Sequence, residues 1–199
     1  MVRTAKFFPV LDQGMEYRQI YPGPGYKEDI DFIYSIYTQS FPVQERRSRE
    51  QLEAETVHPK ACVGIISVDK KEVGLFIYWD MDEFIYAGHF AVNPLYRGQK
   101  IGERFLSCFL KQLPCPVILE VEPPENEISC RRIAFYERLG LHLFPCDYKQ
   151  PPYNKNESSV PLYLMEAPAH TVSYQVDAKL LLTQNYASIV AKLHKEVYA

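Results

Sequence analysis

Apolar and polar residues alternate along the first half of the chain in patterns that predict both helices and strands. Apolar residues at helical spacing predict a helix at residues 29–40, which Phe41-Pro42 ends, and a charged helix at residues 48–56 with Ser48 as its N-cap. Strands are expected at residues 15–20, 61–68, 73–79 and 84–92. Charged turns separate the last three strands, which indicates an antiparallel meander.

The second half of the chain alternates strands with helices. The expected order is a loop at 93–100, a helix at 101–113, a strand at 116–122, a helix at 128–139 and strands at 141–145 and 160–165 around a polar insertion. A strand, helix, strand order is typical of a crossover between parallel strands. The pattern therefore predicts a mixed α/β fold.

A final helix is expected at residues 176–198. Its apolar stripe contains Leu182, Tyr186, Ile189, Leu193 and Val197. This stripe needs a partner surface, either the domain itself or a second copy of the chain in a homodimer. We therefore expect one domain at residues 1–168 and a C-terminal helical extension at residues 169–199.

Composition narrows the class of protein. The 199 residues, 47% of them hydrophobic, suffice for one sizeable core. A formal net charge of -3 provides no basic field for nucleic acid or anionic lipid. The five cysteines show no CxxC pair and no metal-ligand spacing, which favours a reduced, cytoplasmic chain without a metal. The N-terminus lacks the apolar region of a signal peptide and no apolar run reaches about 18 residues, so neither export nor membrane insertion is expected.

The segment HFAVNPLYRGQKIGERFLSCFL joins a strand end, a glycine-containing loop and an amphipathic helix. Backbone N–H groups at the start of a helix lack intrahelical acceptors, and together with the helix dipole they bind phosphate or pyrophosphate. Gly98 and Gly102 allow the main chain to approach such an anion, and Arg97 can pair with its oxygens. The sequence contains neither the P-loop pattern nor GxGxxG, and a loop with only a structural role is the alternative.

Two motifs resemble the GNAT (GCN5-related) N-acetyltransferase superfamily. AVNPLYRGQKIGERFL is similar to motif A, whose consensus is Arg or Gln, two variable residues, Gly, one variable residue and Gly or Ala. AFYERLGL resembles motif B, FYEKLGF, at the family's usual separation. The resemblance covers residues 15–166 and points to a bacterial branch of the family. Lys100 stands where the consensus has its first glycine.

The resemblance implies a GNAT fold, with a central mixed sheet of about six or seven strands flanked by helices. It also implies an acetyl-CoA-dependent transfer of an acetyl group to a primary amine by direct attack in a ternary complex. The implied cofactor-binding residues are Ala91, Val92, Arg97, Gly98, Gln99, Lys100, Ile101, Gly102, Ser129 and Tyr136. Among them, the Val92 N–H would hold the thioester oxygen and Tyr136 would protonate the thiolate. Ser129 replaces the family's common asparagine and could cap its helix or contact the pantetheine arm.

Three residues compete for the role of general base. Glu120 and Glu122 project from the same side of their strand, and Glu122 is the first choice because it lies nearer the strand's C-terminal end. His89 is a rival, although a half-buried histidine bonded to a neighbour is an equal alternative.

Aromatic walls for the acceptor substrate are expected from Tyr34, Tyr37, Tyr148 and Tyr153. The acceptor itself cannot be read from a fold that serves many amines. A non-catalytic acyl-CoA-binding or regulatory module is the alternative function, and the presence of Tyr136 with the paired carboxylates favours the enzyme.

Overall fold

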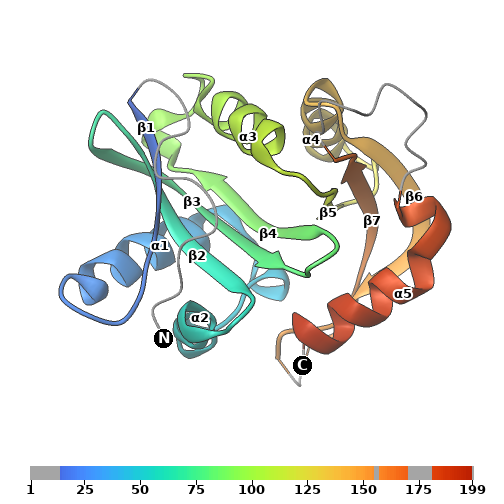
Figure 1. Cartoon of the computed structure of the whole chain (residues 1–199), viewed down its shortest axis with the longest axis horizontal. Coiled ribbons are helices and arrows are strands. Elements are labelled where there is room, and N and C mark those ends of the chain that lie inside the picture. The colour runs from blue at the N-terminus through green and yellow to red at the C-terminus, as the bar shows by residue number, and fades with distance from the viewer. Residues whose placement is uncertain (1–13, 155–156, 170–180, 199) are drawn as a thin grey trace. The chain divides into compact units, whose positions relative to one another are not determined.

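The computed structural model describes residues 14–154, 157–169 and 181–198 (Figure 1). Its helices are α1 (Tyr26–Ser40), α2 (Arg49–Val57), α3 (Ile101–Gln112), α4 (Glu127–Arg138) and α5 (Leu181–Glu196), with 3-10 turns η1 (Val43–Glu45) and η2 (Pro94–Tyr96). Its strands are β1 (Met15–Gln19), β2 (Ala61–Val68), β3 (Lys71–Asp80), β4 (Ile85–Val92), β5 (Val117–Val121), β6 (His142–Gln150) and β7 (Val160–Ala167).

Within the described residues the strands form a seven-stranded sheet of order β1-β2-β3-β4-β5-β7-β6. β1 and β2 pair antiparallel with Met15 opposite Val68, whereas β4 and β5 pair parallel with Ile85 opposite Val117. The parallel pair is the one that α3 connects, as expected for a crossover. The mixed α/β fold, with helices flanking the sheet and a C-terminal helix, is thus confirmed.

The chain divides into two compact units, and β3 and β4 contribute residues to both. The first unit contains the described residues up to Tyr78 together with His89–Phe109. Its core includes the apolar face of α1 against β2 and β3, with Ile33, Ile65 and Leu75 fully buried. The helix stripe predicted from the sequence therefore forms this core.

An aromatic group also packs within the first unit, where α3 lies on the strands. The ring of Phe76 lies 5.2 Å from that of Phe105 and 4.8 Å from that of Phe109, both in edge contact. Phe105 and Phe109 thus belong to the buried face of the amphipathic helix α3.

The second unit contains Trp79–Gly88 and the described residues from Leu110 onward. Its strand β6 continues to Gln150, although the sequence predicts a strand that ends at residue 145. Pro145 cannot donate a ladder hydrogen bond, and the register with β7 shifts between Phe144 and Tyr148. The irregular pairing there lets the strand pass the proline.

Helix α5 packs within the second unit. Leu182, Ile189 and Leu193 are buried, and the ring of Tyr186 lies 5.7 Å from that of Phe144 on β6. The Glu166 carboxylate accepts the first two backbone N–H groups of α5 at 2.6 and 2.8 Å, which caps this helix. Residues 176–180, where the sequence predicts the helix to begin, lie outside the described residues.

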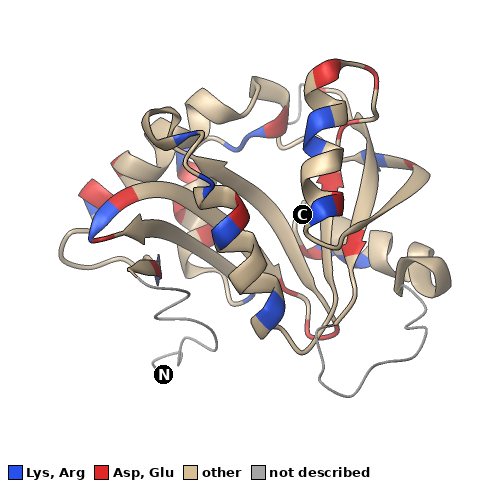
Figure 2. Ribbon diagram, turned by 90° about the horizontal axis from the view of Figure 1, so that it is seen from above, with Lys and Arg blue, Asp and Glu red and all other residues tan. Residues whose placement is uncertain are grey.

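Charged residues lie mainly on helices and turns, and most strand positions are uncharged (Figure 2). This distribution follows from the burial of the strands, since β3 has seven consecutive buried residues. In the described part of the chain no helix has the length and apolar character needed to cross a bilayer.

Candidate active site

The loop after β4 is held against the end of that strand. The Asn93 side chain accepts the Leu95 N–H at 3.0 Å and starts the turn η2. The Arg97 guanidinium donates to the Val92 carbonyl at 3.1 Å and lies 3.4 Å from the Ser40 hydroxyl at the end of α1. Arg97 therefore orders the loop that the sequence predicts to bind an anion.

Two residues of this loop adopt left-handed backbone conformations. Gly98 has φ of 80°, and open space surrounds the position that its Cβ would occupy. Lys100 has φ of 58°, which costs a non-glycine residue roughly 1 kcal/mol. The motif has glycine where this chain has Lys100, and the left-handed backbone gives the physical reason for that preference.

Gly102 has a different role from Gly98. A Cβ on Gly102 would lie 3.3 Å from the Phe90 ring and 3.7 Å from the Val92 side chain. A small residue here lets the first turn of α3 pack closely on β4. The helix thus begins directly beside the strand end.

The start of α3 offers backbone N–H groups to an anion. The helical hydrogen bonds of α3 begin with the one from the Arg104 N–H to the Lys100 carbonyl, at 3.0 Å. The N–H groups that precede Arg104 lie before these helical hydrogen bonds, at the end of the helix that attracts an anion. Gln99 and Lys100 are exposed, whereas Ala91 and Ile101 are buried. The first unit therefore brings the end of β4, the loop and the helix start together, as the motif requires.

In the second unit, Ser129 is part of the N-terminal cap of α4. The Asn126 side chain accepts the N–H groups of Ile128 and Ser129 at 3.0 Å each, and the Ser129 hydroxyl accepts the Asn126 N–H at 3.2 Å. This is a capping box, and of the two roles expected for Ser129 the structure shows the cap.

Tyr136 lies on α4 near an ion pair between Arg132 and Glu122. Burial raises the pKa of Tyr136 to about 12, while Arg132 acts in the opposite direction and Glu122 in the same one. At neutral pH the phenol is therefore protonated and has a proton to donate. Glu122, the first-choice base, has a guanidinium as its partner.

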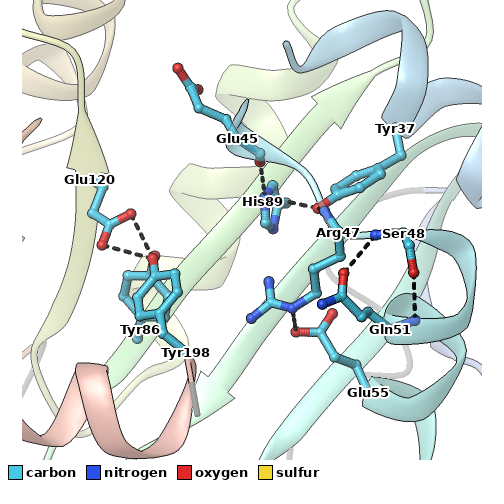
Figure 3. Close-up of polar contacts among 10 residues, drawn as sticks. All are labelled: Tyr37, Glu45, Arg47, Ser48, Gln51, Glu55, Tyr86, His89, Glu120 and Tyr198. Atoms are coloured by element: carbon cyan, nitrogen blue, oxygen red, sulfur yellow. Dashed lines mark hydrogen bonds and ion pairs between the residues drawn. The ribbon is translucent and has the colours of Figure 1, made fainter. Parts of the chain in front are cut away.

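Glu120 lies in a group of tyrosines within the second unit, part of which Figure 3 shows. Its carboxylate accepts a hydrogen bond from the Tyr148 hydroxyl at 2.5 Å and from the Tyr198 hydroxyl at 2.9 Å to each oxygen. The Tyr86 hydroxyl is 2.8 Å from that of Tyr198. The Tyr153 ring packs 5.3 Å from the Tyr198 ring.

His89 lies in the core of the first unit, 5% exposed (Figure 3). Its Nε2 is 3.0 Å from the Glu45 carbonyl and 3.1 Å from the Tyr37 hydroxyl. A carbonyl only accepts, so Nε2 carries the proton in this contact. Burial and then the nearby Arg47 lower the pKa of His89 to about 3. A neutral imidazole with hydrogen bonds in the core fits the alternative interpretation of His89, a histidine bonded to a neighbour, better than it fits the role of a general base.

The expected substrate tyrosines separate into two groups. Tyr37 is fully buried, and its hydroxyl accepts the Arg47 N–H at 3.0 Å, so in this structure it is a core residue rather than an open wall. Tyr34 is half-buried and lies under the Arg49 guanidinium at 5.8 Å. In the second unit, Tyr148 and Tyr153 belong to the group around Glu120.

The sequence-based candidates lack several residues of these arrangements, among them Tyr86, Asn126, Arg132 and Tyr198. Asn126 carries a recognisable signal, because asparagine before a helical pattern is a common N-cap. Tyr86 and Tyr198 depend on contacts between segments 78 and 112 residues apart, whereas Arg132 contacts Glu122 only ten residues earlier, in a pair that no motif connects. Among the described residues, no group of three or more His, Cys, Asp or Glu side chains could hold a metal ion.

Comparisons with known proteins agree with this geometry. Residues 30–141 match the model of the Acetyltransferase (GNAT) family. The structure is similar to that of a protein from Bacteroides thetaiotaomicron assigned to the GNAT acetyltransferases, with 35% identity, a TM-score of 0.80 and coverage of 92% of this chain and 98% of that one. The chain therefore belongs to the GNAT acetyltransferase family, an enzyme class whose members use acetyl-CoA.

More distant structures share the fold. The ribosomal-protein-S18-alanine N-acetyltransferase from Escherichia coli has 16% identity and a TM-score of 0.58, with coverage of 81% of this chain and 98% of that one. Arabidopsis thaliana Naa50 in complex with the bisubstrate analogue CoA-Ac-MVNAL has 16% identity and a TM-score of 0.53, with coverage of 77% and 97%. A comparison with curated proteins found no match.

Proposed function

We propose that this chain is an acetyl-CoA-dependent N-acetyltransferase that transfers the acetyl group to a primary amine by direct attack in a ternary complex. The observation that carries the proposal is the loop from Arg97 to Gly102, whose left-handed Gly98 and Lys100 lead into the N-terminus of α3. A pyrophosphate fits such a loop, because the backbone N–H groups and the helix dipole both favour an anion. The open space around Gly98 leaves room for it.

The remaining binding roles follow the family motifs. The loop residues Arg97 to Gly102 bind the pyrophosphate, and Ala91 and Val92 at the end of β4 bind the arm that carries the thioester. The Val92 N–H donates to the thioester oxygen, where negative charge develops during attack. Ser129 keeps α4 in its capped form and thereby positions Tyr136.

The reaction needs one proton donor and one proton acceptor. The amine lone pair attacks the thioester carbon, the C–S bond breaks, and the leaving thiolate takes the Tyr136 proton. The attacking nitrogen loses a proton to Glu122, directly or through water, while Arg132 holds that carboxylate in place. Glu120 and His89 are less suited to this role, because tyrosine donors bind the Glu120 carboxylate and His89 is bonded in the core.

The proposal places the reaction in the cytoplasm. The structure describes all five cysteines and forms no disulfide among them, as is typical of a reducing compartment.

Replacement of Tyr136 by Phe tests the catalytic part of this proposal. We expect kcat to fall by about a hundredfold with little change in acetyl-CoA affinity, since only proton donation is lost. The assay measures thiol release from acetyl-CoA with a panel of primary amines, and calorimetry measures the affinity. Tyr21→Phe, at an exposed tyrosine, is the matched control.

Two outcomes would count against the proposal. Full kcat in Tyr136→Phe would remove Tyr136 as the acid. Tight binding of acetyl-CoA by the wild-type protein, with no amine in the panel increasing thiol release, would favour the non-catalytic acyl-CoA-binding module.

A further inference from the structure

The group around Glu120 combines a carboxylate with four tyrosines from distant parts of the second unit. Tyr86 lies on β4, Tyr148 on β6, Tyr153 in the segment after β6 and Tyr198 after α5. Tyr86 and Tyr148 are buried, whereas Glu120, Tyr153 and Tyr198 are half-buried. Glu120, Tyr153 and Tyr198 are therefore partly exposed. We call these five residues the Glu120 cluster.

The hydroxyl protons of the Glu120 cluster have a defined direction. Tyr198 donates its only proton to Glu120, so in the 2.8 Å contact between two hydroxyls Tyr86 is the donor and Tyr198 the acceptor. Tyr148 donates to Glu120 as well. Both donors thus orient the carboxylate within the cluster, and Figure 3 shows the two contacts of Tyr198.

The tyrosines add no charge to this group. Burial and then the negative Glu120 raise the pKa values of Tyr86, Tyr148 and Tyr198 above the ordinary value for a phenol. Neutral phenols leave the charge of the carboxylate unchanged, and a partly exposed carboxylate next to the paired rings of Tyr153 and Tyr198 favours an organic cation. An ammonium group has the charge that this arrangement selects.

The position of the Glu120 cluster on β5 relates it to the proposed chemistry. Glu120 lies on β5 and Glu122 directly follows the last residue of that strand, Val121, so the two residues are roughly 7 Å apart along an extended chain. Glu122 lies with Arg132 near Tyr136, the proposed proton donor. A cation at Glu120 would therefore lie a short alkyl chain away from the proposed base.

We propose that the Glu120 cluster binds the ammonium group of an acceptor that carries two amines, a small aliphatic diamine. This inference rests on the proposed function. The attacked amine must be neutral to use its lone pair, whereas the Glu120 carboxylate selects a charged one. A diamine satisfies both requirements, with one ammonium held at Glu120 and the second nitrogen available for acetyl transfer.

Calorimetric binding of cadaverine to the intact protein tests this inference without any acetyl transfer. The matched ligands are pentylamine, which lacks the second amine, and 6-aminohexanoate, in which a carboxylate replaces it. All three ligands offer one ammonium to Glu120, but only cadaverine has a second amine to place near Glu122, so we expect it to bind about tenfold or more tightly than either. Equal binding of cadaverine and pentylamine would overturn the proposal.

Variants locate the site. Glu120→Gln keeps the size of the side chain and removes its charge, and we expect it to weaken cadaverine binding about tenfold or more. Tyr153→Leu removes a half-buried ring face and should weaken it by a smaller factor. Undiminished cadaverine affinity in Glu120→Gln would overturn the assignment. If a variant fails to fold, the binding of the three ligands to the wild-type protein still tests whether the second amine contributes to affinity.

Acetyl-CoA titration of the same samples separates the two proposals. Wild-type protein and Glu120→Gln should bind acetyl-CoA equally, since Glu120 is not part of the loop after β4. Loss of cadaverine binding with retained acetyl-CoA binding supports the diamine site. Cadaverine binding without any acetyl-CoA binding would contradict the proposed function and leave the cation site standing.

Discussion

The two units of this molecule each contain a group of buried polar residues, and the two groups differ in how their charges are balanced. In the first unit Arg47 and Glu55 pair at 2.9 Å, each 6% exposed, next to the hydrogen bonds of Tyr37 and His89. In the second unit the half-buried Glu120 carboxylate accepts hydrogen bonds from tyrosines.

The comparison separates a structural group from a candidate binding group. The first group pairs the Arg47 cation with the Glu55 anion. The Arg47 N–H also donates to the Tyr37 hydroxyl on α1, and this hydrogen bond fixes the segment that connects α1 to α2. The phenols of the Glu120 cluster orient a carboxylate and bring no positive charge to it. Burial with a countercharge favours stability of one conformation, whereas a half-buried anion among aromatic faces favours recognition of a cation.

Removal of one charge from each group should have unequal effects on stability. Arg47→Met leaves the Glu55 carboxylate buried without its guanidinium, which costs about 3–5 kcal/mol of unfolding free energy. Glu120→Gln keeps an acceptor for the tyrosines at a half-buried position and should cost less than about 1 kcal/mol. Urea denaturation of both variants measures the difference. Equal losses would show that the Glu120 cluster is as structural as the Arg47–Glu55 pair.

The first group should also control stability in acid. Since burial lowers the pKa of His89 from 6.5 to about 3, the unfolded chain binds more protons between these values, and the unfolding free energy falls as the pH is lowered through this range. Glu55, with its pKa raised to about 6, opposes this trend between pH 4.5 and 6, so the fall is steepest below pH 4.5.

Comparison of His89→Gln with the wild-type protein isolates the histidine contribution. The variant should lack the loss of unfolding free energy that His89 causes in acid. We expect this loss to exceed about 2 kcal/mol between neutral pH and a pH below the folded-state pKa of His89. Denaturation at a series of pH values measures it. Parallel pH profiles for the two proteins would mean that His89 is not held neutral in the core.

The sequence predicts those parts of the fold that depend on local pattern. Ser48 is the N-cap of α2 as expected, and the residues of β2 coincide with the predicted range 61–68. The pattern fails where tertiary pairing overrides it, as at Pro145, which was expected to end a strand that in fact continues to Gln150. A proline stops a regular ladder, but an irregular register tolerates it.

The candidate site likewise has a part that local pattern predicts and a part that depends on tertiary contacts. The loop from Arg97 to Gly102 is contiguous, so a local motif predicts it. The partners of Glu120 lie 28 and 78 residues away, at Tyr148 and Tyr198, and no spacing rule connects them. The burial of His89 likewise depends on α1, more than 40 residues earlier in the chain. Contacts of this kind require the folded structure.

Calorimetric titration of acetyl-CoA into Gly98→Glu and Gly25→Glu tests the central claim most directly. Gly98 and Gly25 have φ of 80° and 79° with open space around each, so the two substitutions impose the same backbone strain and the same charge. Only Gly98 lies in the loop proposed to bind the pyrophosphate. We predict wild-type affinity in Gly25→Glu and no detectable binding in Gly98→Glu, whereas wild-type affinity in Gly98→Glu would contradict the account.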